Sequence, residues 1–114
     1  MNPKVRIVAD HREAASRIPG LLEEYGAEVV RKQLKTGDYI LNDEIVVERK
    51  SRDDFIISII QGRLFTQCAA LKRADRHSVL LIEGNPYQTK HNIDRKAIQG
   101  ALLSVSVCWQ AKMN

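Results

Sequence analysis

The chain has 114 residues, of which 44% are apolar; this fits one folded domain with a hydrophobic core and excludes a disordered chain. Its apolar stretches hold about five residues at most, which excludes a membrane-spanning helix. Cys68 and Cys108 are too few for a disulfide scaffold or a zinc site. The formal net charge of +4 is compatible with a nucleic-acid partner but does not require one.

The sequence shows no internal linker and no repeat, so residues 1–114 are expected to form a single domain. The first residues lack the apolar core of a secretory signal. We therefore expect an intracellular chain, cytoplasmic in a prokaryote or virus and nuclear in a eukaryote.

The first half of the chain predicts short strands and one helix. Alternating apolar residues indicate a strand at Lys4–Ala9, which ends in a polar tip. Ser16 as a cap, Pro19 in the first turn and Gly26 as a stop favour a helix over Ser16–Tyr25. The three strands that follow are expected at Glu28–Leu34, Tyr39–Leu41 and Ile45–Arg49, the last two forming a hairpin around an Asn-Asp turn.

The second half predicts three helices and one strand. Ser51 opens the first helix, and Gly62 separates it from a second helix over Arg63–Ala74. The apolar run Ser78–Glu83 is typical of a strand that is covered on both faces. After a loop, a last helix is expected from Asn92 or Asp94 to about Trp109. This order of elements predicts an α/β fold with a mixed β-sheet flanked by α-helices.

Three chemically active side chains are expected to meet at one end of the predicted hairpin. Residues two apart on a strand point to the same face, so Glu48 and Lys50 project together and Arg49 projects away. Because the hairpin strands pair, Asp38 at the beginning can approach Glu48 at the end. The pattern therefore predicts two carboxylates and one amine side by side.

This set of groups suits metal-dependent hydrolysis of a phosphodiester. Carboxylate oxygens are ligands that Mg²⁺ and Mn²⁺ prefer, and a bound metal acidifies water and offsets phosphate charge. Lys50, beside two carboxylates, is expected to stay protonated until a metal neutralises them, and so to position water and stabilise charge. The spacing is similar to the core of the PD-(D/E)xK nucleases, although Glu-x-Lys also occurs on solvated strands.

A longer string is far more specific. Gly37-Asp38-x(9)-Glu48-Arg49-Lys50-x(3)-Asp54 resembles the GDx(n)ERKx(3)D signature of the XPF-type structure-specific endonucleases, which include the archaeal Hef nucleases. Four further segments resemble the family's motifs in the same order, namely 8–13, 37–41, 62–67 and 79–83. The resemblance implies a restriction-endonuclease-like sheet, and it covers residues 5 to 105.

The resemblance also implies roles for individual residues. Asp38, Glu48, Lys50 and Asp10 match catalytic residues, and a metal is expected on Asp38, Glu48, Asp10 and the backbone carbonyl of Arg49. Supporting or DNA-contacting roles fall to Asp54, Arg12, Arg49, Arg63 and Gln67. Two of these have simpler interpretations: Asp54 as a helix-start residue, and Arg63 with Gln67 as a surface pair.

The implied function is a Mg²⁺- or Mn²⁺-dependent endonuclease that cuts DNA near branches such as 3′ flaps or forks, in repair or recombination. Two alternatives are a non-catalytic DNA-binding or dimerisation subunit, and a PD-(D/E)xK nuclease with another nucleic-acid substrate. The family's helix-hairpin-helix and helicase regions are not expected in this chain. Its last helix is unusually apolar, which favours a homodimer or family heterodimer through Leu102, Leu103, Val105, Val107 and Trp109.

Overall fold

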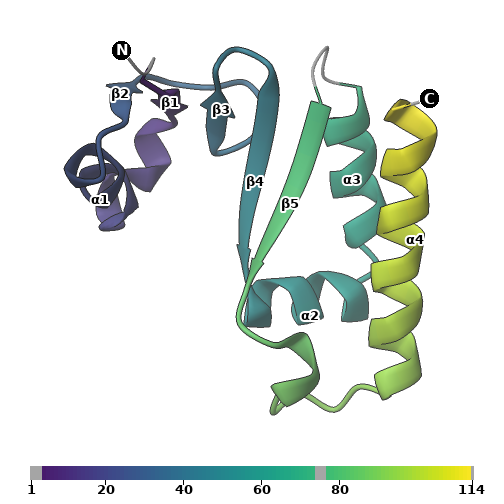
Figure 1. The fold of residues 1–114 in the computed structure, drawn as a ribbon. Coiled ribbons are helices and arrows are strands. Elements are labelled where there is room, and N and C mark those ends of the chain that lie inside the picture. Colours follow the sequence, from purple (N-terminus) through teal and green to yellow (C-terminus); the bar gives the residue numbers. More distant parts are fainter. Residues whose placement is uncertain (1–3, 74–76, 114) are drawn as a thin grey trace.

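One mixed sheet organises the molecule (Figure 1). The computed structural model describes residues 4–73 and 77–113, with side chains described as far as residue 106. Within them, five strands lie in the order β2-β1-β3-β4-β5. The strands are β1 (Arg6–Ala9), β2 (Glu28–Arg31), β3 (Tyr39–Leu41), β4 (Ile45–Ser51) and β5 (His77–Glu83). The pairs β1–β2 and β4–β5 are parallel, whereas β3 runs antiparallel to both β1 and β4.

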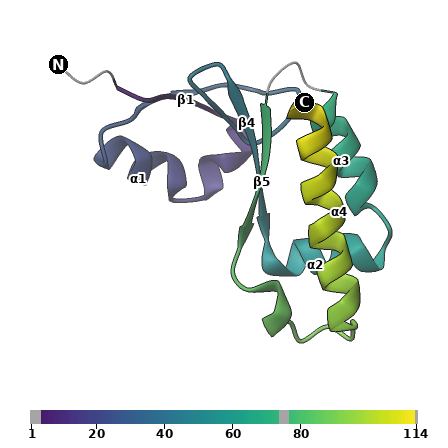
Figure 2. The ribbon, with the colours of Figure 1, turned by 45° about the vertical axis from the view of Figure 1, so that its right-hand side comes forward.

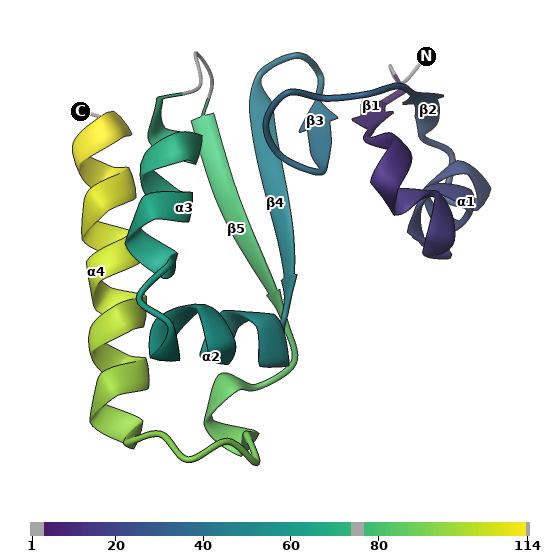
Figure 3. The same ribbon diagram turned by 180° about the vertical axis from the view of Figure 1, so that it is seen from behind.

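Helices cover the two faces of this sheet unequally. In Figure 2 the sheet separates α1 (Ile18–Glu24) from α2 (Arg52–Ile60), α3 (Leu64–Lys72) and α4 (Arg95–Met113). Two short 3₁₀ helices, η1 (His11–Ala15) and η2 (Pro86–Gln88), complete the described elements. Figure 3 shows from behind that α4 and α3 lie side by side, far from α1. No helix among the described residues is long and apolar enough to cross a membrane.

Each face of the sheet has its own apolar core. On the α1 side, Ile7, Ala9, Tyr39 and Val47 are buried together. On the other side, α2, α3 and α4 enclose a larger cluster with Phe55, Ile56, Leu64, Cys68, Ile98, Ala101 and Val105. Because apolar side chains are buried on both faces of the sheet, the side chain of each strand residue must point to one particular face.

The hairpin that carries the predicted site has a tight turn. Asn42 and Asp43 have φ values of 49° and 59°, the left-handed geometry of the two central residues of a turn that the Glu44 amide closes by donating to the Leu41 carbonyl at 2.9 Å. Tyr39 pairs with Val47 and Leu41 with Ile45, so both strands emerge in fixed register. The predicted hairpin and its Asn-Asp turn are confirmed.

Several predicted boundaries differ from the structure. The helix expected from Ser16 begins at Ile18, and Ser16 Oγ instead accepts a hydrogen bond from the Ile18 amide. The strand expected at Glu28–Leu34 ends at Arg31, and the polar tip after β1 is the 3₁₀ helix η1. Ser51 caps α2 as predicted, with Oγ 3.1 Å from the Asp54 amide nitrogen. Ala74 lies outside the described residues.

The prediction that residues 78–83 are covered on both faces is wrong. β5 is an edge strand, and Val79 and Leu81 are 41% and 51% exposed. Leu80 and Ile82 pack toward the helices on the opposite face. An apolar run in the sequence is the same for a strand covered on both faces and for an edge strand that lies beyond its covering helix. In this domain α1 packs over β1–β4 and leaves one face of β5 open.

Candidate active site

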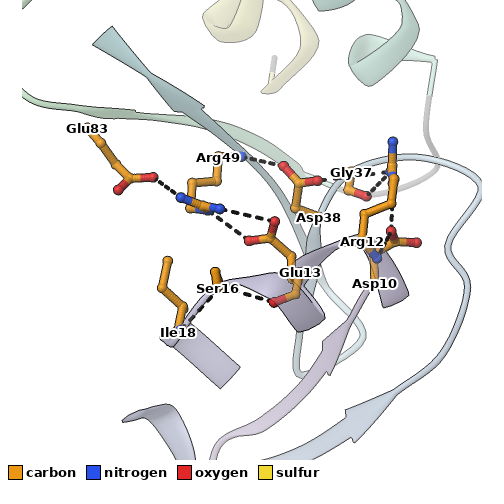
Figure 4. Close-up of polar contacts among 9 residues, drawn as sticks. All are labelled: Asp10, Arg12, Glu13, Ser16, Ile18, Gly37, Asp38, Arg49 and Glu83. Atoms are coloured by element: carbon orange, nitrogen blue, oxygen red, sulfur yellow. Dashed lines mark hydrogen bonds and ion pairs between the residues drawn. The ribbon is translucent and has the colours of Figure 1, made fainter. Parts of the chain in front are cut away.

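Strand alternation in β4 divides the signature residues between the two faces of the sheet. Glu48 and Lys50 line a cleft whose opposite wall comes from α3. The Arg49 side chain leaves the other face, where its guanidinium bonds Glu13 and Glu83 (Figure 4). The prediction that Arg49 projects away from Glu48 and Lys50 is therefore confirmed. The Arg49 guanidinium makes a structural contact on the opposite face of the sheet.

Asp38 joins the site through backbone geometry. Its amide donates to the Val47 carbonyl at 2.8 Å, and its Oδ2 accepts from the Arg49 amide at 2.8 Å. The amide and carbonyl of one strand residue point to the same neighbouring strand. The Arg49 carbonyl therefore points toward the Asp38 side of β4, where sequence analysis expects a metal ligand.

Burial and repulsion from neighbouring carboxylates disfavour the charged forms of Asp38 and Glu48. Burial raises the pKa of Asp38, and the hydrogen bond from the Arg49 amide only partly offsets it. Burial also raises the pKa of Glu48, and repulsion from Asp38 raises it further. Lys50 and Arg12 act in the opposite direction on Glu48, but they do not restore its ordinary pKa. An added cation would relieve this repulsion.

Asp10 is engaged by its own neighbours. Arg12 Nε lies 2.6 Å from Oδ2, which also accepts from the Arg12 amide, while Oδ1 accepts from the Leu34 amide at 2.7 Å. The ion pair with Arg12 is the largest cause that lowers the pKa of Asp10, to about 2. Asp10 is thus held ionised at the end of β1, with its oxygens bonded inside the protein.

Arg12 links Asp10 to Asp38 (Figure 4). Its Nη2 lies 3.3 Å from the Gly37 carbonyl oxygen and 3.9 Å from Asp38 Oδ1. Its side chain is also 69% exposed. Arg12 therefore brings an accessible positive charge to the mouth of the cleft, as a phosphate-binding group requires.

A second ionic cluster lies behind the site. Arg49 Nε is 2.8 Å from Glu13 Oε1, and Nη2 is 3.2 Å from Glu13 Oε2, a bidentate arrangement. Burial opposes the charge on Glu13, but the Arg49 contacts outweigh it and lower the pKa of Glu13. This cluster ties η1 to β4 and β5, and so fixes the backbone that bears Asp38, Glu48 and Lys50.

The donor set fits a hard divalent cation that keeps most of its water. The described residues contain no group of three His, Cys, Asp or Glu side chains arranged for a metal ion. Asp38 and Glu48, with the Arg49 carbonyl, supply oxygen atoms only. Mg²⁺ is commonly held by one or two carboxylates together with water and substrate phosphate. The carboxylate pair of Asp38 and Glu48 matches that mode of binding.

Comparison with known proteins assigns the chain to a family. The ERCC4 domain profile matches residues 9–113. The chain belongs to the ERCC4 domain family. The predicted resemblance to XPF-type nucleases and the predicted α/β fold are both confirmed by relatives that share this domain.

Relatives of this ERCC4 domain include nucleases of DNA repair. It is 38% identical over 110 residues to the 3′-flap repair endonuclease Xpf of Saccharolobus solfataricus, covering 96% of this chain and 47% of that protein. It is 48% identical over 80 residues to DNA repair endonuclease XPF of Mus musculus, covering 70% of this chain and 9% of that protein. The structure of XPF from Aeropyrum pernix in complex with DNA superposes with a TM-score of 0.86 and 33% identity, covering 94% of this chain and 54% of that one. The chain spans about half the length of these proteins or less.

The remaining predicted residues of this ERCC4 domain lie at different places. Gln67 lines the cleft with Glu48 and Lys50. Arg63 is not brought to Gln67, because its Nε donates to Gln61 Oε1 at 2.7 Å. Asp54 is exposed in the first turn of α2, where a negative charge stabilises a helix.

Glu13 and Glu83 were not among the predicted site residues. Both carboxylates bond the Arg49 guanidinium. The available signal was that Arg49 must project away from Glu48 and Lys50, which calls for an acidic partner on the opposite face. Lys35, from the loop before β3, was not predicted either, and it also lines the cleft.

Proposed function

We propose that this ERCC4 domain is the catalytic unit of a Mg²⁺- or Mn²⁺-dependent endonuclease that cuts DNA near branches. The observation that carries the proposal is the acidic pair of buried Asp38 and partly buried Glu48, whose pKa values are raised, with Glu48 beside Lys50 in one cleft. Raised carboxylate pKa values in a cleft are typical of a functional site. The names of the relatives, a 3′-flap repair endonuclease and DNA repair endonucleases, support the choice of substrate.

Asp38, Glu48 and the Arg49 carbonyl would hold the metal ion. When bound, the ion supplies an acidified water and a positive charge that offsets the charge on the phosphate. Asp38 is oriented for this by the Arg49 amide, which fixes one of its oxygens. Asp10 stays a predicted fourth ligand; its oxygens would have to exchange their bonds with Arg12 and Leu34 to reach the ion.

Lys50 and Arg12 provide the positive charges of the proposed reaction. Lys50 shares the cleft with Glu48, so its ammonium can orient the attacking water and stabilise charge that develops on the phosphate. Arg12 lies at the mouth and is positioned to bind a phosphate oxygen of the strand. Removal of either positive charge should therefore slow DNA cleavage strongly and change the free energy of unfolding little.

The direct test is cleavage of labelled DNA. Wild type, Asp38→Asn and Lys50→Ala are compared on a 3′ flap, a fork, a plain duplex and an RNA of the same sequence, each with Mg²⁺, Mn²⁺ or EDTA. We expect metal-dependent cutting near the branch by wild type only. Glu44→Gln serves as a matched control, because Glu44 is exposed in the hairpin turn and does not line the cleft. Cutting by Asp38→Asn at the wild-type rate would contradict the proposed site.

We also propose that the domain self-associates through its C-terminal part, which includes α4, and that the neighbouring helix α3 contributes to the contact. Phe65 and Leu103 on these helices are 60% and 61% exposed, which is unusual for such large apolar side chains. Val105 is instead buried in the core, and the side chains of Val107 and Trp109 lie outside the described residues. Sedimentation analysis should show a dimer that Phe65→Lys converts to monomer; a monomer at high concentration would contradict it. An intracellular site of action stays a prediction.

A further inference from the structure

The cleft that Glu48 and Lys50 line is a cavity of about 220 Å³ between β4 and α3. Its interior is largely apolar, with Leu64 and Leu71 buried and Leu80 packed against the same core. Its rim is basic, since Arg12, Lys35 and Lys50 all line it. The cavity therefore combines an apolar interior with a positively charged edge, directly next to Glu48.

One wall of the cavity carries an unsatisfied polar atom. Gln67 lines it from α3, and the side-chain oxygen Oε1 is buried without a hydrogen-bond partner among the described residues. A buried acceptor without a partner is unfavourable, so nearly all such groups in proteins are bonded. Because this oxygen has almost no accessible surface, a ligand in the cavity would meet it only after the Gln67 side chain turns toward the cavity, and an N–H group there would then remove the penalty.

We propose that this cavity takes one unpaired nucleobase, from a nucleotide next to the phosphodiester bond that is cut. The inference rests on the proposed nuclease function and adds the part of the substrate that is recognised. At about 220 Å³ the cavity is smaller than pockets for drug-sized ligands, which hold roughly 300–1,000 Å³, and so suits a single base. The flat face of a base lies against the leucines, and its N–H group donates to Gln67 Oε1.

Charge and polarity favour a base over a bare phosphate. A phosphate in the interior would lie against leucine side chains without hydrogen-bond donors, whereas the phosphates that flank a captured base reach the basic rim. This arrangement also gives a physical reason for cutting near branches. A base in a continuous duplex must lose pairing and stacking before it can enter, while a base at a branch has already lost its partner.

The first test removes the base from the substrate. A set of 3′-flap oligonucleotides carries one abasic site at each successive position around the junction. We expect one position at which the abasic site lowers kcat/KM of wild type about tenfold, the scale of losing one base contact. In Gln67→Met, which lacks the acceptor, the intact substrate should be cut more slowly and the abasic penalty should shrink. Equal penalties in wild type and Gln67→Met would overturn the assignment of Gln67.

A second variant fills the cavity without touching its polar wall. Ala70 lines the cavity and is exposed on α3, so Ala70→Leu adds volume at little risk to folding. Thr66→Leu is the matched control, because Thr66 is exposed on the same helix but does not line the cavity. We expect Ala70→Leu to slow cutting of intact flaps and to spare the abasic flap, with Thr66→Leu unchanged. Slowing of both substrates alike by Ala70→Leu would refute base capture.

A binding measurement separates this inference from the proposed function. The base analogue 2-aminopurine is placed at each flap position, and its fluorescence is followed as Asp38→Asn protein is added without cutting. No aromatic side chain is among the described residues that line the cavity, so a base that leaves its stack there should brighten. Ala70→Leu in the same background should abolish the change. Cutting by wild type without any fluorescence change refutes the base site alone, whereas a fluorescence change without cutting by wild type refutes the nuclease.

Discussion

Replacing Gly37 by Ala should be among the most damaging single methyl additions in this domain. Gly37 has φ of +82°, and an added Cβ would lie 2.4 Å from Val46 Cγ1 and 3.4 Å from the Val47 carbonyl oxygen. The left-handed backbone costs an L-residue about 1–2 kcal/mol. The contact with Val46, which is buried, adds about 1–3 kcal/mol of overpacking. The total loss of unfolding free energy is therefore about 2–5 kcal/mol.

Gly62→Ala isolates the backbone part of this effect. Gly62 has φ of +71°, but nothing lies within 4 Å of an added Cβ there. Its loss should be only about 1–2 kcal/mol. Urea unfolding followed by circular dichroism gives both values from the midpoints, provided that the m-values agree. Equal losses for the two variants would refute the steric reasoning, and a loss at Gly37 should be accompanied by slower cleavage because Asp38 is the next residue.

Three further predictions concern charge. Arg49→Met leaves the Glu13 carboxylate buried without its partner, so thermal or urea unfolding should show a loss of about 3–5 kcal/mol, partly restored by adding Glu13→Gln. Asp10 ionises in the folded state with a pKa of about 2 and in the unfolded chain near 3.8, so its stabilisation is lost as pH falls between these values. Asp10→Asn should flatten the unfolding free energy over that range. Glu48→Gln removes an unfavourable charge, so it should raise Tm at neutral pH and abolish the stabilisation that added Mg²⁺ gives wild type.

Two of these predictions have a matched control variant. Glu83 is the more exposed partner of Arg49, so Glu83→Gln should cost less than about 1 kcal/mol, and a larger loss would contradict the assignment of the main contact to Glu13. Glu44→Gln is the control for Glu48→Gln, because Glu44 is exposed in the hairpin turn. An equal Mg²⁺-induced rise of Tm in Glu48→Gln and wild type would show that the metal binds elsewhere.

Local patterns were sufficient for most of the fold. Alternation of apolar residues, the Ser51 cap, the Asn-Asp turn and the burial spacing of Leu64, Cys68 and Leu71 act over a few residues, and the structure confirms them. The relation of Glu48, Arg49 and Lys50 also followed from strand geometry alone. These inferences succeed because backbone geometry decides which side of an element a residue takes.

Whether a strand face is covered, and which group a charged side chain contacts, depends on segments that are distant in the chain. The predictions of these features were incomplete. The apolar run of β5 was expected to be covered on both faces, yet Val79 and Leu81 are exposed because α1 packs over the other strands. Ile60 is a large apolar residue of α2, yet its side chain is 54% exposed at the end of the helix. Neither outcome is encoded in the neighbouring residues.

By itself, the sequence determined the order of strands and helices and the pairing of Asp38 with Glu48 and Lys50. Periodicity, capping and hairpin register dictate these features within a short span of chain. The tertiary structure decided that Arg49 bonds Glu13 and Glu83, and that Gln67 faces a cavity beside Lys50. Such contacts join residues far apart in the chain, and only the packing of α3 and η1 against β4 brings them together.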